Sequence, residues 1–300
     1  MKKTENSNTA EMENPLEQYP KPPYDAQQQR PPGVEKELQP TADHGETSYK
    51  GSGKLQGRKA IITGGDSGIG RAVAIAFARE GADVVISYLN EDEDATETAK
   101  YVEDAGRKAV LIAGDISNEE HCKKIIDKAI DELGEIDILV NNAAYQMTHS
   151  SLQEITDEEL DHTFKTNIYA MFYLCKAAEP HLKPGSTVVN TTSVNAYKPS
   201  PGLLAYATTK GAIQNFTSGL AQLWADKGIR VNCVAPGPIW TPLIPSTMPP
   251  EKVKNFGQDT PLKRAGQPAE LAPIYVLLAS QDSSYMTGST VQVTGGTPTI

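Results

Sequence analysis

Short apolar runs alternate with longer amphipathic stretches along the chain from about residue 57 onward. Each run is apolar at consecutive positions and rich in β-branched residues, which is typical of strands buried on both faces of a sheet. The predicted strands are 59–63, 83–87, 109–113, 137–141, 186–191, 230–235 and 289–293. The predicted helices lie near 69–80, 92–105, 118–133, 157–182, 203–227 and 268–279.

Alternating strands and helices predict parallel strands, because each helix carries the chain back to the start of the next strand. The pattern therefore indicates an α/β fold of three layers. We expect a doubly wound, seven-stranded parallel sheet (a Rossmann fold) with helices on both faces, formed as a single domain by residues 55–300.

Residues 1–54 have a different character: they are rich in proline and show neither a helical nor an alternating apolar pattern. Two interpretations of this arm remain open. It is a disordered tail, or it is an extended arm that crosses a neighbouring subunit and is anchored there by Tyr19, Tyr24 and Tyr49.

Charge and composition narrow the class of partner. A net charge of −10 argues against general affinity for nucleic acid or for an anionic membrane. The three cysteines and five histidines show no metal-ligand spacing, so we expect no metal site. No apolar stretch is long enough to span a membrane and no secretory signal is apparent, so we expect a cytoplasmic protein.

The stretch "TGGDSGIG" (63–70) places glycines where the first strand ends and a helix begins. The N-terminus of that helix directs free N–H groups and the positive end of the helix dipole at the turn, which suits a pyrophosphate. We expect Gly64, Gly68 and Gly70 to allow the tight turn, the approach of a phosphate and the packing of the helix on the strand.

In its spacing this turn resembles the cofactor turn of the short-chain dehydrogenase/reductase superfamily. Further motifs of that family follow in order: "GDIS" (114–117), "NNAA" (141–144), "KTNI" (165–168), "TTSVNAY" (191–197), "YATTK" (206–210) and "PGPIWTP" (236–242). The resemblance covers about residues 57–296. The proline-rich extension resembles that of a bacterial subgroup described as general stress proteins.

The resemblance implies a nicotinamide cofactor and small-molecule chemistry at an alcohol or carbonyl group. The implied cofactor contacts are Gly64, Asp66, Ser67, Gly68, Ile69, Gly70, Tyr88, Leu89, Asp115, Ile116, Asn142, Ala143, Ala144, Tyr206, Lys210, Pro236, Gly237, Ile239 and Thr241. Neither the acid typical of NAD-preferring relatives nor the basic residue typical of NADP-preferring ones stands at Tyr88 and Leu89. The glycine turn carries no arginine and the run 91–94 is acidic, so we favour NAD over NADP.

Tyr206 and Lys210 are four residues apart and therefore lie on one face of a helix. A nearby ammonium favours a phenolate, so Lys210 is expected to lower the pKa of Tyr206 from about 10 and prepare it as general acid/base. Ser193 is expected to hold the substrate oxygen. The resemblance assigns Asn167 the role of anchoring a water that relays protons to Lys210.

The segment 243–262 is irregular and proline-rich, and we expect it to form a mobile lid over the substrate. Gln146, Met147, Asn195, Trp240 and Met248 are candidates for the pocket wall, with packing in the core as the alternative for each.

The hypothesis from the sequence is an NAD(P)-dependent oxidoreductase that transfers a hydride to or from an alcohol or carbonyl substrate. The alternative is a catalytically silent nucleotide-binding regulatory or structural protein on the same fold. By resemblance, the helices 157–182 and 203–227 and the C-terminal "STVQVTGG" form the surfaces of a homotetramer, in which residues 1–50 reach another subunit.

Overall fold

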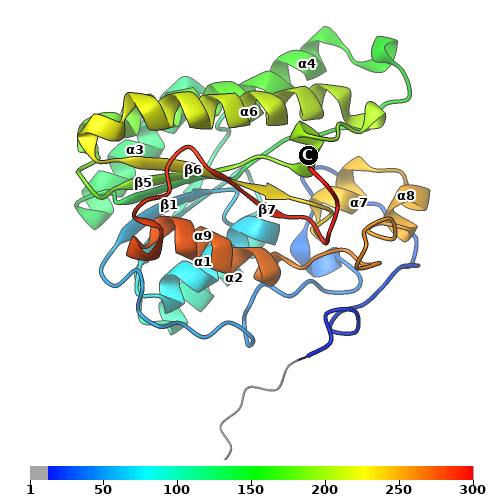
Figure 1. Ribbon diagram of the computed structural model, residues 1–300, viewed down its shortest axis with the longest axis horizontal. Coiled ribbons are helices and arrows are strands. Elements are labelled where there is room, and N and C mark those ends of the chain that lie inside the picture. The colour runs from blue at the N-terminus through cyan, green and yellow to red at the C-terminus, as the bar shows by residue number, and fades with distance from the viewer. Residues whose placement is uncertain (1–12, 300) are drawn as a thin grey trace, which may run out of the picture.

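The computed structural model describes residues 13–299. A parallel sheet of seven strands in the order β3-β2-β1-β4-β5-β6-β7 runs through the molecule, with helices on both faces (Figure 1). The strands are β1 (Lys59–Thr63), β2 (Asp83–Tyr88), β3 (Ala109–Ala113), β4 (Ile138–Asn141), β5 (Thr187–Thr191), β6 (Arg230–Pro236) and β7 (Thr290–Val293). The predicted doubly wound α/β fold is confirmed.

Both faces of the sheet are buried, which explains why the strands are apolar at consecutive positions. In β1, Ala60 and Ile62 face one core while Ile61 faces the other. The first core is covered by α1 (Gly68–Arg79), α2 (Asp92–Asp104) and α9 (Pro268–Ala279). The second is covered by α3 (Glu119–Leu133), α5 (Ala170–Ala178) and α6 (Leu204–Leu223).

The predicted helix 157–182 is divided into pieces that follow one another without a loop. α4 (Asp157–Phe164) passes through a π-helical turn (Lys165–Tyr169) into α5, which ends in the 3-10 turn Glu179–His181. The predicted lid contains two short helices, α7 (Leu243–Thr247) and α8 (Pro250–Lys254). The other 3-10 turns are Glu35–Glu37, Leu152–Glu154, Val194–Ala196, Pro201–Leu203, Ala225–Lys227 and Gln281–Ser283.

The strand order reverses beside β1, because β2 lies on one side of it and β4 on the other. Ile62 pairs with Ile86 of β2 and with Val140 of β4. The chain leaves β1 and β4 in opposite directions, which opens a crevice at their carboxyl ends. The glycine turn after β1 and the loop after β4 therefore lie side by side at the edge where a ligand is expected.

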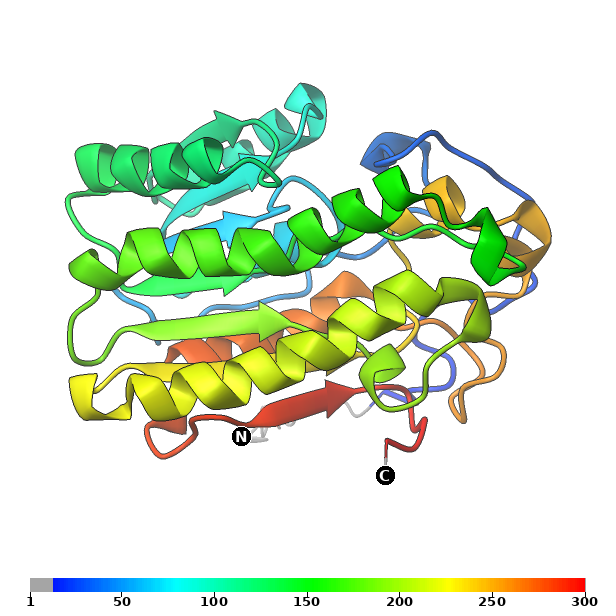
Figure 2. The same ribbon diagram turned by 90° about the horizontal axis from the view of Figure 1, so that it is seen from above.

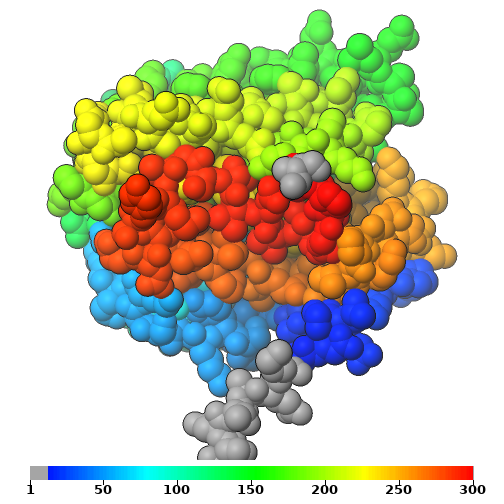
Figure 3. Space-filling view, in the orientation of Figure 1, coloured from blue at the N-terminus to red at the C-terminus, as the bar shows by residue number. Residues whose placement is uncertain are grey.

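The described part of the arm, residues 13–54, packs on its own chain. Tyr24, Leu38 and Ala42 are buried in a third, smaller hydrophobic core together with Trp240 and residues of α7 and α8. The rings of Tyr24 and Trp240 lie 4.3 Å apart. In the space-filling view the blue arm lies against the orange lid segment (Figure 3). The arm thus covers the lid of the chain that carries it, and residues 1–12 lie outside the described part.

Two properties concern the whole described range. Within residues 13–299, none of the helices is both long enough and apolar enough to cross a membrane. In that same range, acidic, histidine and cysteine side chains do not gather into a group able to hold a metal ion.

Candidate active site

A cavity of about 330 Å³ opens at the carboxyl ends of the strands. Its walls come mainly from the glycine turn, the loops after β2, β3, β4, β5 and β6, and the first turns of α6 and α7. The predicted site residues on its wall are Gly64, Asp66, Ser67, Gly68, Ile69, Tyr88, Leu89, Asp115, Ile116, Asn142, Ala143, Ala144, Ser193, Tyr206, Lys210, Pro236, Gly237, Ile239 and Thr241. Gly70 and Asn167 are the two predicted site residues that lie behind the wall.

The glycine turn is shaped by close contacts. A Cβ on Gly70 would lie 1.8 Å from the carbonyl oxygen of Gly64, so only glycine lets α1 pack against the turn. Gly68 has a φ of +49°, and a Cβ there would lie 2.9 Å from Cγ2 of Thr241. The turn therefore presents bare backbone to the cavity and brings the loop after β6 close to it.

Asn142 joins the loop after β4 to the same turn. Its side-chain Nδ2 donates to the carbonyl oxygens of Thr63 and Gly64, at 3.1 and 3.2 Å. Its backbone N–H donates to Oγ1 of Thr63 at 3.0 Å. These bonds hold the two sides of the crevice at a fixed separation.

The predicted catalytic side chains meet at the other end of the cavity. Ser193 follows β5, and Tyr206 and Lys210 lie one turn apart on α6. Nζ of Lys210 is 5.1 Å from the centre of the Tyr206 ring and donates to the carbonyl oxygen of Thr191 at 2.9 Å. Oγ of Ser193 accepts from the backbone N–H of Asn195 at 3.1 Å.

The pKa of Tyr206 differs from the expectation that Lys210 lowers it. Desolvation raises the pKa of Tyr206 to about 12, against a smaller opposing effect of Ser193. Desolvation also lowers the pKa of Lys210 to about 7. Removal from water favours the neutral form of both groups, so it outweighs the predicted effect of the ammonium on the phenol. Tyr206 therefore carries its proton near neutral pH and can donate it.

Asn167 lies in the π-helical turn and is buried. Its Nδ2 donates to the carbonyl oxygen of Tyr145 and to Oγ1 of Thr209, while its Oδ1 accepts from the N–H of Tyr145. The amide thus links the loop after β4 to α6, which carries Tyr206. In this geometry Asn167 positions those elements from behind the cavity wall. π-helical turns are frequent at functional sites.

The wall near Tyr88 and Leu89 is acidic. Asp66 is buried there, which raises the pKa of its carboxyl to about 7. Glu91 also lines the cavity, and burial together with neighbouring carboxylates raises its pKa. Lys210 is the one lysine or arginine among the described wall residues, and it lies at the end of the cavity that holds Ser193 and Tyr206. Of the acidic run 91–94, Glu91 therefore lines the cavity. The sequence alone did not show whether any residue of this run lies close to the cofactor site.

The candidates for the substrate wall divide into two groups. Gln146, Asn195 and Met248 line the cavity. Met147 is not among the wall residues, and Trp240 is fully buried, with its indole N–H donating to the carbonyl oxygen of Pro40 at 2.7 Å. Trp240 is therefore a packing residue that holds the arm.

Sequence reasoning missed several wall residues. These are, among others, Pro32, Tyr145, His162, Leu203 and Phe256. The rings of Tyr145 and His162 meet edge to face with their centres 4.6 Å apart. Pro32 belongs to the arm, 32 residues before the glycine turn begins, and no local pattern connects it with the site.

Comparison with curated proteins gives relatives that match almost the whole chain. General stress protein 39 of Bacillus subtilis (strain 168) is 56% identical over 278 residues, which cover 93% of this chain and 97% of that protein. Glucose and ribitol dehydrogenase of Daucus carota is 48% identical over 275 residues, covering 90% of this chain and 94% of the relative.

A family model and a solved structure also match the chain. Residues 64–298 match the family model described as Enoyl-(Acyl carrier protein) reductase. A short chain dehydrogenase from Burkholderia cenocepacia J2315, solved in complex with NADP, is 31% identical and superposes with a TM-score of 0.77, covering 81% of this chain and 98% of the other. The chain belongs to the short-chain dehydrogenase/reductase family.

Proposed function

We propose that this chain is an NAD(P)-dependent oxidoreductase that transfers a hydride between a nicotinamide cofactor and an alcohol or carbonyl substrate. One observation carries the proposal: Ser193, Tyr206 and Lys210 line the same cavity as the glycine turn. A dinucleotide held at the turn would extend along the carboxyl ends of the strands toward these side chains.

The residues present fit such a cofactor. Bare backbone at Gly64 and Gly68 leaves room for a pyrophosphate at the N-terminus of α1. Asp115 and Ile116 fit the adenine end, and Lys210 fits the ribose at the nicotinamide end. The bound nicotinamide supplies the hydride chemistry, while the protein supplies position and electrostatics.

In the reducing direction, Tyr206 would donate its phenolic proton to the substrate oxygen, and the nicotinamide, when bound, would supply the hydride. Ser193 donates a hydrogen bond to the same oxygen and holds it in place. Both steps use protons that the side chains carry at neutral pH, since the pKa of Tyr206 is raised. In the oxidising direction the same phenol must first be deprotonated.

The names of two relatives support a small carbonyl or polyol substrate. One is glucose and ribitol dehydrogenase of Daucus carota, and another is NADPH-dependent aldehyde reductase 1 of Arabidopsis thaliana, 48% identical over 272 residues. The mixture of amide and apolar side chains at Gln146, Asn195 and Met248 is compatible with such molecules.

The test is turnover by the purified chain. NADH and NADPH are each supplied with a panel of small aldehydes and ketones, and NAD and NADP with sugars and polyols, while absorbance of the reduced nicotinamide is followed. Turnover that depends on both partners supports the proposal. Tight cofactor binding without turnover across the panel would instead favour a catalytically silent nucleotide-binding protein.

We further propose that NAD is the preferred cofactor, because Glu91 places a carboxylate on the cavity wall near Tyr88 and Leu89, where a 2′-phosphate would lie. Glu91→Gln is expected to lower the KM for NADP(H) several-fold and to change the KM for NAD(H) less than twofold. Glu93→Gln is the matched control, because Glu93 is two residues along, does not line the cavity and pairs with Lys36. Equal effects of the two variants would contradict this assignment.

The proposal includes a homotetramer. α5 and α6 lie side by side across the face seen in Figure 2. Exposed large hydrophobic side chains belong to these elements: Tyr169 directly before α5, Phe172 in α5 and Leu223 at the end of α6. The Phe172 ring lies against Phe216 of α6, with ring centres 4.6 Å apart. Such a patch is typical of an association surface. Light scattering on the purified chain measures the mass, and a monomer at micromolar concentration would contradict the proposal.

A further inference from the structure

The arm contacts the glycine turn directly through Glu35. This residue lies in the 3-10 turn Glu35–Glu37 and is buried. Its Oε2 accepts a hydrogen bond from the backbone N–H of Gly68 at 2.8 Å. Gly68 is the first residue of α1, and the preceding Ser67 makes no side-chain capping bond. The arm therefore supplies the acceptor that the local sequence lacks.

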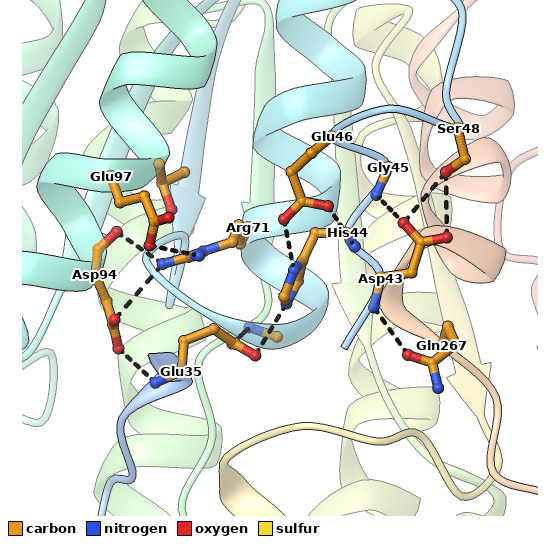
Figure 4. Close-up of polar contacts among 12 residues, drawn as sticks. Glu35, Asp43, His44, Gly45, Glu46, Ser48, Arg71, Asp94, Glu97 and Gln267 are labelled. Carbon is orange, nitrogen blue, oxygen red and sulfur yellow. Dashed lines mark hydrogen bonds and ion pairs between the residues drawn. The ribbon is translucent and has the colours of Figure 1, made fainter. Parts of the chain in front are cut away.

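Glu35 is held at both of its ends. Its backbone N–H donates to Oδ2 of Asp94 at 2.9 Å. Its Oε1 lies 3.1 Å from Nε2 of His44, whose Nδ1 lies 2.9 Å from Oε1 of Glu46 (Figure 4). Glu35 and His44 are both almost completely buried. The carboxylate is consequently fixed in one position against the turn.

The turn is also held from the other side by Arg71. Its Nε donates to the carbonyl oxygen of Asp66 at 2.9 Å, and its guanidinium pairs with Asp94 at 3.6 Å and with Glu97 at 3.1 Å. Asp94 thus contacts both Arg71 and Glu35. The three residues 66–68 are therefore fixed at each end by one connected network.

The negative charges behind the turn are partly balanced. A carboxylate there repels a pyrophosphate, and His44, which lies between Glu35 and Glu46, offsets one of their two negative charges. Burial opposes the charged imidazole, yet the two carboxylates outweigh it and raise the pKa of His44 to about 9. His44 is therefore a cation at neutral pH, which reduces the repulsion that Glu35 exerts on an anion at the N-terminus of α1.

The arm belongs to the matched region of the close relatives. YghA of Escherichia coli (strain K12) is 50% identical over 287 residues that cover 95% of this chain, so at most 5% of the chain lies outside the match. The matched Burkholderia cenocepacia structure covers 81% of the chain. The match to YghA therefore includes most of the arm. The match to the solved structure consists mostly of the Rossmann-fold domain.

We infer that Glu35 and His44 are positioning residues of the cofactor site: they hold the turn Asp66–Gly68 in the shape that accepts the dinucleotide pyrophosphate. Neither residue lines the cavity, so they act through the backbone of the turn. The inference rests on the proposed cofactor binding. In this arrangement the arm, which lies outside the Rossmann fold, completes the phosphate site.

The test measures the Kd of NADH by nicotinamide fluorescence with the full-length chain. Glu35→Ala is expected to raise the Kd about tenfold, which corresponds to about 1.4 kcal/mol. The kcat at saturating cofactor is expected to change less than twofold. Glu35→Gln keeps an acceptor for the Gly68 N–H and is expected to retain most of the affinity. A tenfold loss of affinity in Glu35→Gln would contradict the role of this hydrogen bond, and this second variant keeps the inference testable where Glu35→Ala does not fold.

Tyr49→Phe is the matched control. Tyr49 belongs to the same arm, and its hydroxyl donates to Glu80 at 2.5 Å, directly after the opposite end of α1. It is expected to loosen the arm with an unchanged Kd. An equal rise in Kd for both variants would overturn the inference, as would a tighter Kd in Glu35→Ala. No NADH or NADPH binding by the unmodified chain would instead refute the proposed function.

Discussion

Tyr206→Phe is expected to lower kcat for carbonyl reduction by roughly 10²- to 10⁴-fold, the range that a positioned general acid contributes. The substitution removes the only group of Tyr206 that can transfer a proton and retains the ring that packs beside Lys210. The Kd of the cofactor is expected to change less than twofold. Steady-state rates and a fluorescence titration of NADH on the same preparation measure both quantities.

Tyr145→Phe provides the control for this result. Tyr145 lines the same cavity, and its hydrogen bonds to Asn167 are made by backbone atoms that the substitution leaves in place. Its activity is expected to stay within a few-fold of the unmodified chain. More than a tenth of the activity remaining in Tyr206→Phe would remove Tyr206 from the role of general acid/base.

The pH profile gives the same assignment a second test. Since the pKa of Tyr206 is raised to about 12, the phenolate needed for alcohol oxidation is scarce at neutral pH and its fraction rises with pH. The rate of oxidation is therefore expected to rise toward alkaline pH. The rate of reduction is not expected to rise, because reduction uses the protonated phenol. In Tyr206→Phe the alkaline rise should be absent.

The sheet and the convergence of Ser193, Tyr206 and Lys210 on one cavity could be predicted from the sequence because their signals are local. Consecutive apolar positions in β1 identify a strand buried on both faces, and the spacing of Tyr206 and Lys210 places both on one face of a helix. The need for glycine at position 70 is likewise local, because a side chain there would collide with the carbonyl oxygen of Gly64 in the same turn. Each of these inferences needs only a few neighbouring residues.

The arm and its contacts could not be predicted for the opposite reason. Glu35 meets Gly68 across 33 residues of chain, and Trp240 meets Pro40 across 200. An extended, proline-rich segment has no periodicity that would show which of its side chains are buried. The π-helical turn at Asn167 was equally hidden, since the sequence predicts one continuous helix over 157–182.

Deleting residues 1–45 is expected to lower the stability of the folded chain by several kcal/mol. Tyr24, Leu38 and Ala42 would no longer cover Trp240, Ile244 and their neighbours. Full burial of one large apolar side chain is worth about 1.5–3 kcal/mol. For a chain of this size, each kcal/mol shifts the Tm by about 2–4 °C, so a fall of roughly 10 °C or more is expected. Thermal unfolding followed by circular dichroism measures it.

The dependence on protein concentration distinguishes the two places where the arm could act. The described contacts of the arm lie within one chain. The fall in Tm is therefore expected to be the same in a dilute sample and in one about 50 times more concentrated. An arm that stabilised mainly by crossing to another subunit would give a loss that grows on dilution, together with dissociation. Deleting residues 1–12 leaves every described contact in place and should leave the Tm unchanged, so an equal fall in both deletions would contradict the role of Tyr24 and Leu38.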